Sequence, residues 1–127
     1  MATMIADRSL LIVDDNESFL AACDSFLSEC GFHVMKALSG PEAVDICEGE
    51  SNSFALAIVD LNMPDLDGPA TINALKRMQP GLKIIAVSGA MLVPYFVQLN
   101  ELGVRHFLQK PFYLDGLLDS IRLAMAA

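Results

Sequence analysis

Residues 10–15 read LLIVDD, a short apolar run that ends in two carboxylates. The same pattern recurs in ALAIV (55–59) before Asp60, KIIAV (83–87) before Ser88 and HFLQ (106–109) before Lys110. Short runs rich in Val, Ile and Leu, separated by helix-length amphipathic segments, are typical of buried parallel strands. The sequence therefore predicts an α/β domain in which helices cover both faces of a parallel sheet.

The segments between these apolar runs carry the sequence patterns of helices. Apolar residues recur at helical spacing from Phe19 to Cys30, and Gly31 follows as a C-terminal cap. FHVMKA (32–37) reads as a further strand, and Ser39 with Glu42 forms a capping box before the next helix. Five strand–helix units fit a chain of 127 residues, which predicts a single domain over 1–127, with 1–8 as a short flexible extension.

Composition excludes several classes of protein. A formal charge of −8 repels phosphate backbones and anionic lipid surfaces, so we expect no direct nucleic-acid binding. No apolar run reaches the roughly 18 residues that a membrane span needs, so we expect no membrane partner and a cytoplasmic location. The cysteines at 23, 30 and 47 have no metal-ligand spacing and are predicted to be buried reduced thiols.

The candidate site consists of polar residues at the carboxyl ends of the strands, where open α/β sheets bind ligands. If the first and third strands are neighbours, Asp14 and Asp15 face Asp60. Three close carboxylates repel one another, and hard oxygen ligands favour Mg²⁺, or Mn²⁺, over zinc. A carboxylate is also a nucleophile toward phosphorus, and Asp60 is the candidate for that role. Lys110 and the Ser88 hydroxyl would then neutralise charge on the phosphoryl oxygens.

Each residue also has an ordinary structural explanation. An aspartate after a strand is commonly a helix cap or a turn former, and a lone serine or lysine in a loop is usually unremarkable. The combination is different, because all of these residues fall at strand ends on different units and have compatible chemistry. That combination favours a phosphoryl-transfer site.

The chain resembles the receiver domains of two-component response regulators over nearly its whole length. The segments that carry the resemblance are LLIVDDNE (10–17), IVDLNMPDLDG (58–68), VSGA (87–90) and HFLQKPF (106–112). The resemblance implies a flavodoxin-like (βα)5 three-layer sandwich with strand order 2-1-3-4-5. It also implies phosphorylation of Asp60 by a histidine kinase or a histidine phosphotransfer domain. Such a domain labels itself and decays, so it is not a turnover enzyme.

The same resemblance assigns the remaining residues. Asp15, Asp60 and the backbone carbonyl of Asn62 would hold Mg²⁺, with Asp14 assisting through water. Ser88 and Phe107 match the switch pair, in which the hydroxyl moves toward the phosphoryl group and the aromatic ring turns inward. Lys110 matches the phosphate-contacting lysine, and the bond to Pro111 is expected to be cis.

The segment AMLVPYFVQLNEL (90–102) is more apolar than one buried helix face requires. Because Pro94 suits the first turn of a helix, the helix is expected to start late. Some of the apolar side chains should then be exposed. We expect this helix, the strand at 106–109 and the final helix to form a partner or homodimer surface that phosphorylation remodels. The final helix would contribute apolar side chains at positions 117, 118, 121, 124 and 125.

Two other function classes stay open. A haloacid-dehalogenase-type phosphatase also uses an aspartyl nucleophile and magnesium. Its pattern would place a second aspartate two residues after the nucleophile, whereas Asn16 follows Asp14 at that spacing. The other alternative is a phosphorylation-independent interaction module of the same fold, whose acidic cluster merely takes up a cation. Phosphoryl uptake from a small donor would separate this module from a working receiver.

Overall fold

The computed structural model describes residues 8–49, 53–63, 68–89 and 92–126. Five parallel strands form one sheet in the order β2-β1-β3-β4-β5, which confirms the predicted topology. The strands are β1 (Ser9–Val13), β2 (His33–Ala37), β3 (Leu56–Asp60), β4 (Lys83–Ser88) and β5 (His106–Gln109). The helices are α1 (Glu17–Glu29), α2 (Gly40–Glu48), α3 (Gly68–Met78), the 3₁₀ turn η2 (Val93–Tyr95), α4 (Phe96–Glu101) and α5 (Leu114–Ala126).

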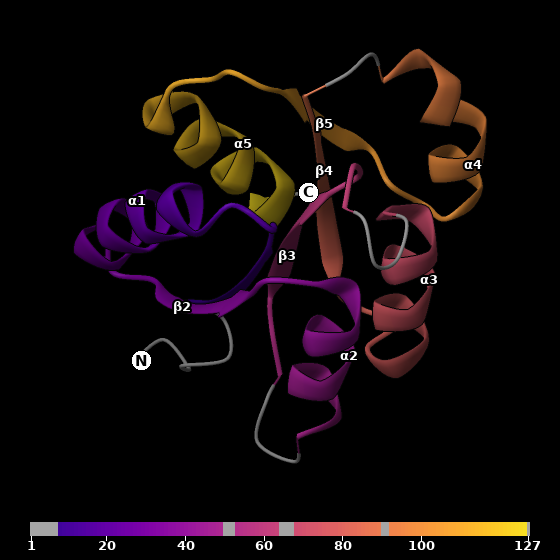
Figure 1. Cartoon of the computed structure of the whole chain (residues 1–127), viewed down its shortest axis with the longest axis horizontal. Coiled ribbons are helices and arrows are strands. Elements are labelled where there is room, and N and C mark those ends of the chain that lie inside the picture. The colour runs from indigo at the N-terminus through magenta and orange to yellow at the C-terminus, as the bar shows by residue number, and fades with distance from the viewer. Residues whose placement is uncertain (1–7, 50–52, 64–67, 90–91, 127) are drawn as a thin grey trace.

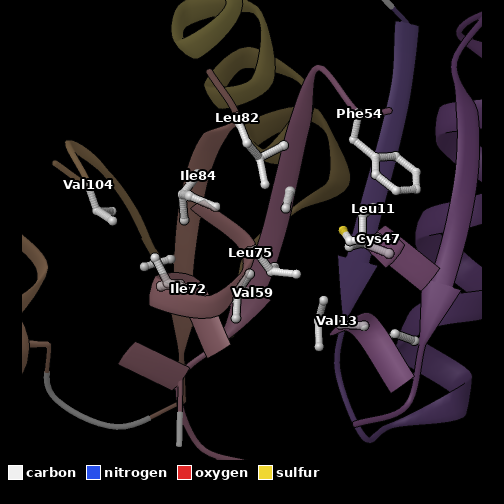
Figure 2. Close-up of a cluster of buried hydrophobic side chains, with 14 of the residues drawn as sticks. Leu11, Val13, Cys47, Phe54, Val59, Ile72, Leu75, Leu82, Ile84 and Val104 are labelled. Carbon is white, nitrogen blue, oxygen red and sulfur yellow. The ribbon is translucent and has the colours of Figure 1, made fainter. Parts of the chain in front are cut away.

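The helices form two layers around the sheet (Figure 1), as the sequence predicts. Helices α1 and α5 lie together on one face, and α2, α3 and α4 lie on the other. Successive side chains of a strand point to opposite faces. Leu11 and Val13 of β1 therefore join the core on the α2–α3 side (Figure 2), whereas Leu10 and Ile12 join the core under α1 and α5.

Local signals for the helix ends are confirmed. Ser39 caps α2, and its hydroxyl accepts a hydrogen bond from the Glu42 N–H at 3.2 Å. Gly31 follows the C-cap of α1 with φ of +94°, a left-handed conformation that glycine adopts without steric cost. The predicted extension over 1–8 lies outside the described residues except for Arg8. The Arg8 guanidinium donates to the carbonyl oxygens of Gly31 and Cys30.

The fourth helix starts late, as Pro94 predicts. The 3₁₀ turn η2 precedes α4, which begins only at Phe96. Val93, Phe96 and Val97 are exposed, which confirms that one face cannot bury this apolar run. Positions 90 and 91 of the run lie outside the described residues.

The prediction for α5 was wrong in one respect. Leu117, Ile121 and Ala124 are fully or almost fully buried in the core against α1 and the sheet, so they cannot form a partner surface. The helical period places them on the inward face, and Leu123, which is 67% exposed, lies outward instead. Cys23 and Cys47 are buried free thiols as predicted, whereas Cys30 is only half-buried. Within the described parts of the chain, every helix is too short or too polar to cross a bilayer.

Candidate functional site

The acidic site lies where β1 and β3 end side by side. Val13 pairs with Val59 in the parallel register, so the next residues, Asp14 and Asp60, lie at the same edge of the sheet. Asp14, Asp15 and Asp60 each offer a carboxylate oxygen, and these oxygens all lie within 4.8 Å of one another. Asp14 and Asp60 are 1% and 6% exposed, whereas Asp15 is exposed. The structure thus brings together the three carboxylates that the sequence predicts.

Backbone amides hold the two buried carboxylates in place. Asp14 Oδ1 accepts a hydrogen bond from the N–H of Asn16 at 2.9 Å, and Asp60 Oδ1 accepts one from the N–H of Asn62 at 3.0 Å. Asn16 also caps α1, because its side chain accepts from the N–H of Phe19 at 3.0 Å. The turns after β1 and β3 therefore each fix one oxygen of their aspartate through a backbone N–H.

Lys110 places a positive charge among these carboxylates. Its Nζ donates to Asp14 Oδ2 at 2.6 Å and lies 3.8 Å from Asp60 Oδ2. The ammonium also lies 4.2 Å from the centre of the Phe19 ring, a cation–π contact. The Lys110 backbone N–H donates to the Ser88 carbonyl at 2.7 Å, and the Lys110–Pro111 peptide is cis, as expected from the resemblance.

The surroundings of Asp60 raise the pKa of its carboxyl above the ordinary value. Burial is the largest cause, and repulsion from Asp14 and Asp15 adds to it. The Asn62 N–H and the Lys110 ammonium act in the opposite direction. A cation added to this site would relieve the repulsion, so the donor set of carboxylate oxygens fits Mg²⁺ or Mn²⁺.

Ser88 ends β4, beside the site, and is completely buried. Its hydroxyl donates to Asn62 Oδ1 at 2.6 Å. The Asn62 amide nitrogen in turn donates to the Tyr95 hydroxyl at 3.4 Å, a long contact that reaches the 3₁₀ turn η2. The structure therefore connects Ser88 to the start of α4 through the exposed side chain of Asn62.

Phe107 is the predicted site residue that lies apart from the carboxylates. It is half-buried on β5, and its ring centre lies 5.3 Å from that of Phe96 on α4. The two rings line a surface cavity of about 480 Å³, and the remaining lining residues are Val97, Asn100, Val104 and Arg105.

Two participants were missed by sequence reasoning. Phe19 was read only as a core residue at helical spacing, yet its ring lies against Lys110 and packs edge-on to Phe112. Its place in the first turn of α1, directly after the strand end that carries Asp15, is the signal that could have found it. The contact of Tyr95 with Asn62 has no comparable signal in the sequence.

Comparison with known proteins identifies the family. The family described as "Response regulator receiver domain" matches residues 10–122. The chain belongs to this receiver domain family. Receiver domains of two-component systems are phosphoacceptors rather than classical enzymes, interact with histidine kinases and generally bind Mg²⁺ at an acidic pocket.

The receiver domain is similar to parts of longer regulatory proteins. It is 34% identical over 122 residues to the C4-dicarboxylate transport transcriptional regulatory protein DctD of Rhizobium meliloti, covering 95% of this chain and 26% of DctD. It is 31% identical over 122 residues to the transcriptional regulatory protein PrrA of Mycobacterium tuberculosis, covering 96% of this chain and 52% of PrrA. The chain therefore spans no more than about half the length of these relatives.

Solved structures of receiver domains have the same fold. A CheY-like receiver domain from Methanospirillum hungatei superposes with a TM-score of 0.87 at 27% identity, covering 94% of each chain. A response regulator from Burkholderia pseudomallei superposes with a TM-score of 0.83 at 25% identity, covering 94% of this chain and 69% of the other. The latter structure contains a phosphorylated aspartic acid, a calcium ion and citrate.

Proposed function

We propose that this receiver domain takes a phosphoryl group from a phosphohistidine onto Asp60, with Mg²⁺ bound beside it. The donor would be a histidine kinase or a histidine phosphotransfer domain, in the cytoplasm. One observation carries the proposal: Asp60 is buried at a strand end, with oxygens of Asp14 and Asp15 within 4.8 Å and a lysine ammonium within 3.8 Å. The phosphorylated aspartic acid and bound cation of the Burkholderia relative support it.

The transfer itself needs little covalent chemistry from the protein. An oxygen of the Asp60 carboxylate attacks phosphorus, the phosphorus–nitrogen bond breaks, and the imidazole leaves with the electron pair and takes up a proton. Charge then spreads over the three equatorial oxygens of the phosphoryl group, and catalysis consists mainly of positioning and charge neutralisation. Lys110 lies close enough to Asp60 to contact one of these oxygens, and the Ser88 hydroxyl would donate to another.

The oxygen atoms around Asp60 fit the proposed metal. The exposed Asp15, Asp60 and the Asn62 carbonyl would be direct ligands. Asp14 already accepts hydrogen bonds from Asn16 and Lys110 on its two oxygens, which favours a contact through water over direct coordination. Bound Mg²⁺, or Mn²⁺, would neutralise charge on the phosphoryl group during transfer.

We further propose that phosphorylation changes the face formed by α4, β5 and the exposed side of α5, and that this face binds a partner or a second copy of the domain. The exposed side chains of Phe96 and Val97 and the adjoining cavity beside Phe107 supply its apolar surface. The relatives DctD and PrrA are transcriptional regulatory proteins. The partner would accordingly be an output domain or another regulatory protein, and we propose no direct contact of this domain with nucleic acid.

Intact mass spectrometry after incubation with acetyl phosphate and Mg²⁺ tests the site. We expect one phosphoryl adduct in the wild type, and none with Asp60→Asn or with a chelator present. Phosphorylated histidine kinase or phosphotransfer domain should give the same single adduct faster.

Two outcomes would contradict this proposal. An adduct retained by Asp60→Asn would move the phosphoacceptor to another residue. No adduct under any condition, while partner binding persists, would favour the phosphorylation-independent interaction module.

A further inference from the structure

The side chain of Asn62 occupies a position between the phosphoacceptor site and the start of α4. Its Oδ1 accepts the hydrogen of the buried Ser88 hydroxyl at 2.6 Å, and its Nδ2 donates to the Tyr95 hydroxyl at 3.4 Å. Its backbone N–H meanwhile donates to Asp60 Oδ1 at 3.0 Å. One residue thus contacts the carboxylate, the hydroxyl and the turn before α4.

A serine hydroxyl has one hydrogen to donate. Ser88 gives this hydrogen to Asn62, over a distance at the short end of the range for such bonds. It therefore cannot donate to a phosphoryl oxygen on Asp60 until it leaves Asn62. The amide oxygen of Asn62 and the phosphoryl group compete for the same hydrogen.

We propose that the Asn62 side chain is a positioning residue that holds the Ser88 hydroxyl away from Asp60 before phosphorylation, and that it ties this hydroxyl to Tyr95. The inference rests on the proposed phosphorylation of Asp60. The arrangement before phosphorylation is thus stabilised by its own hydrogen bonds. These bonds connect the site to the proposed partner surface through η2.

The relative strength of the two hydrogen-bond acceptors decides which of them the Ser88 hydroxyl contacts after phosphorylation. A charged phosphoryl oxygen accepts a stronger hydrogen bond than a neutral amide oxygen, so phosphorylation draws the hydroxyl from Asn62. Asn62 then loses its short contact, and its longer contact with Tyr95 is released. Tyr95 is half-buried and packs against the core on the α2–α3 side, so the release changes the surroundings of its hydroxyl while its ring stays packed.

Tyrosine fluorescence can follow this release directly. The chain has two tyrosines and no tryptophan, and Tyr113 is 87% exposed. Tyr113→Phe therefore leaves Tyr95 as the sole tyrosine without disturbing the core. Beryllofluoride with Mg²⁺, a mimic of the phosphoryl group, should change the emission of Tyr95 in this background. Adding Asn62→Ala should shift the emission before the ligand is present and remove most of the ligand-induced change.

The affinity for beryllofluoride is a second readout. If Asn62 had only a structural role, removing its side chain would not tighten the binding of beryllofluoride. Removing a bond made only in the resting state favours the liganded state. Asn62→Ala should therefore bind beryllofluoride about threefold to tenfold more tightly than the wild type. Tyr95→Phe, which removes one oxygen and keeps the ring, should bind about twofold more tightly, as suits a long hydrogen bond. Tyr113→Phe is the matched control and should bind as the wild type does.

The failures of the two proposals are distinguishable. Wild-type protein that binds no beryllofluoride and takes up no phosphoryl group would contradict the phosphoacceptor function itself. Two results would overturn only the role of Asn62. In the first, the protein binds beryllofluoride but the Tyr95 emission does not change. In the second, Asn62→Ala and Tyr95→Phe both bind beryllofluoride with the wild-type affinity. Tyr95→Phe keeps that test open if Asn62→Ala does not fold.

Discussion

Replacing Lys110 with methionine should destabilise the domain more than the loss of any surface charge. The ammonium lies 2.6 Å from Asp14 Oδ2, and the side chain of Asp14 is only 1% exposed. Breaking a fully buried ion pair costs about 3–5 kcal/mol, because the remaining charge is poorly hydrated. Since the Lys110 side chain is 25% exposed, water screens part of this effect. We expect a loss of about 2–3 kcal/mol, or about 10 °C in Tm for a domain of this size.

Magnesium should reverse much of this loss. Without Lys110, the carboxylates of Asp14, Asp15 and Asp60 have no ammonium among them, so a divalent cation binds more tightly and stabilises the folded state. The Tm of Lys110→Met should therefore rise more steeply with Mg²⁺ than that of the wild type. Phosphoryl uptake from acetyl phosphate should stay low, because the ion does not restore the contact between the lysine and the phosphoryl group.

The assay is thermal unfolding with and without millimolar Mg²⁺, and Lys36→Met is the matched control. Lys36 lies 2.9 Å from Asp24, but the two side chains are 44% and 29% exposed. Such a pair contributes about 0.5 kcal/mol, and its loss should not depend on Mg²⁺. Equal losses in the two variants, or a loss in Lys110→Met that Mg²⁺ does not change, would refute the reasoning.

Two further substitutions test the site and the loop that carries it. Burial raises the pKa of Asp60, so the folded domain binds this proton more tightly than the unfolded chain does. In metal-free buffer Asp60→Asn should therefore raise the Tm at pH 7. This gain in Tm should disappear as the pH falls below 3.8, the ordinary pKa of an aspartate. A gain in Tm that persists in acid would indicate better packing of the asparagine instead. A Cβ at Gly68 would lie 2.4 Å from Leu61 Cα, so Gly68→Ala should lose about 3 kcal/mol or more in urea unfolding. Gly116→Ala, in the open first turn of α5, should gain about 0.5–1 kcal/mol, and similar effects at both glycines would contradict this account.

The sheet could be predicted from the sequence because four of the five strands end at a chemically distinctive residue. Burial on both faces makes β1, β3 and β4 continuous apolar runs, and parallel pairing brings their ends to one edge. This reasoning predicts that Asp14, Asp60 and Ser88 lie at the same edge of the sheet. The strand order followed from resemblance to the family.

The side-chain partners inside the site could not be predicted in the same way. That Ser88 bonds to Asn62, and Asn62 to Tyr95, depends on rotamers and on the path of the chain before α4. The error at α5 has a different origin. The helical period puts Leu117 and Ile121 on one face of α5, and the packing of that face against α1 and the sheet decides that they are covered.

Strand β5 links the surface cavity to the acidic site. Phe107 forms part of the wall of the surface cavity, and Lys110, directly after the strand, neutralises the acidic site. Among the described residues the strand pairs only with β4, and the Lys110 N–H is anchored to the Ser88 carbonyl. A displacement of β5 along β4 would therefore move the cation and the aromatic ring together. Substitutions in the cavity can change which partner fits it, but any that shift this backbone will also alter the chemistry at Asp60.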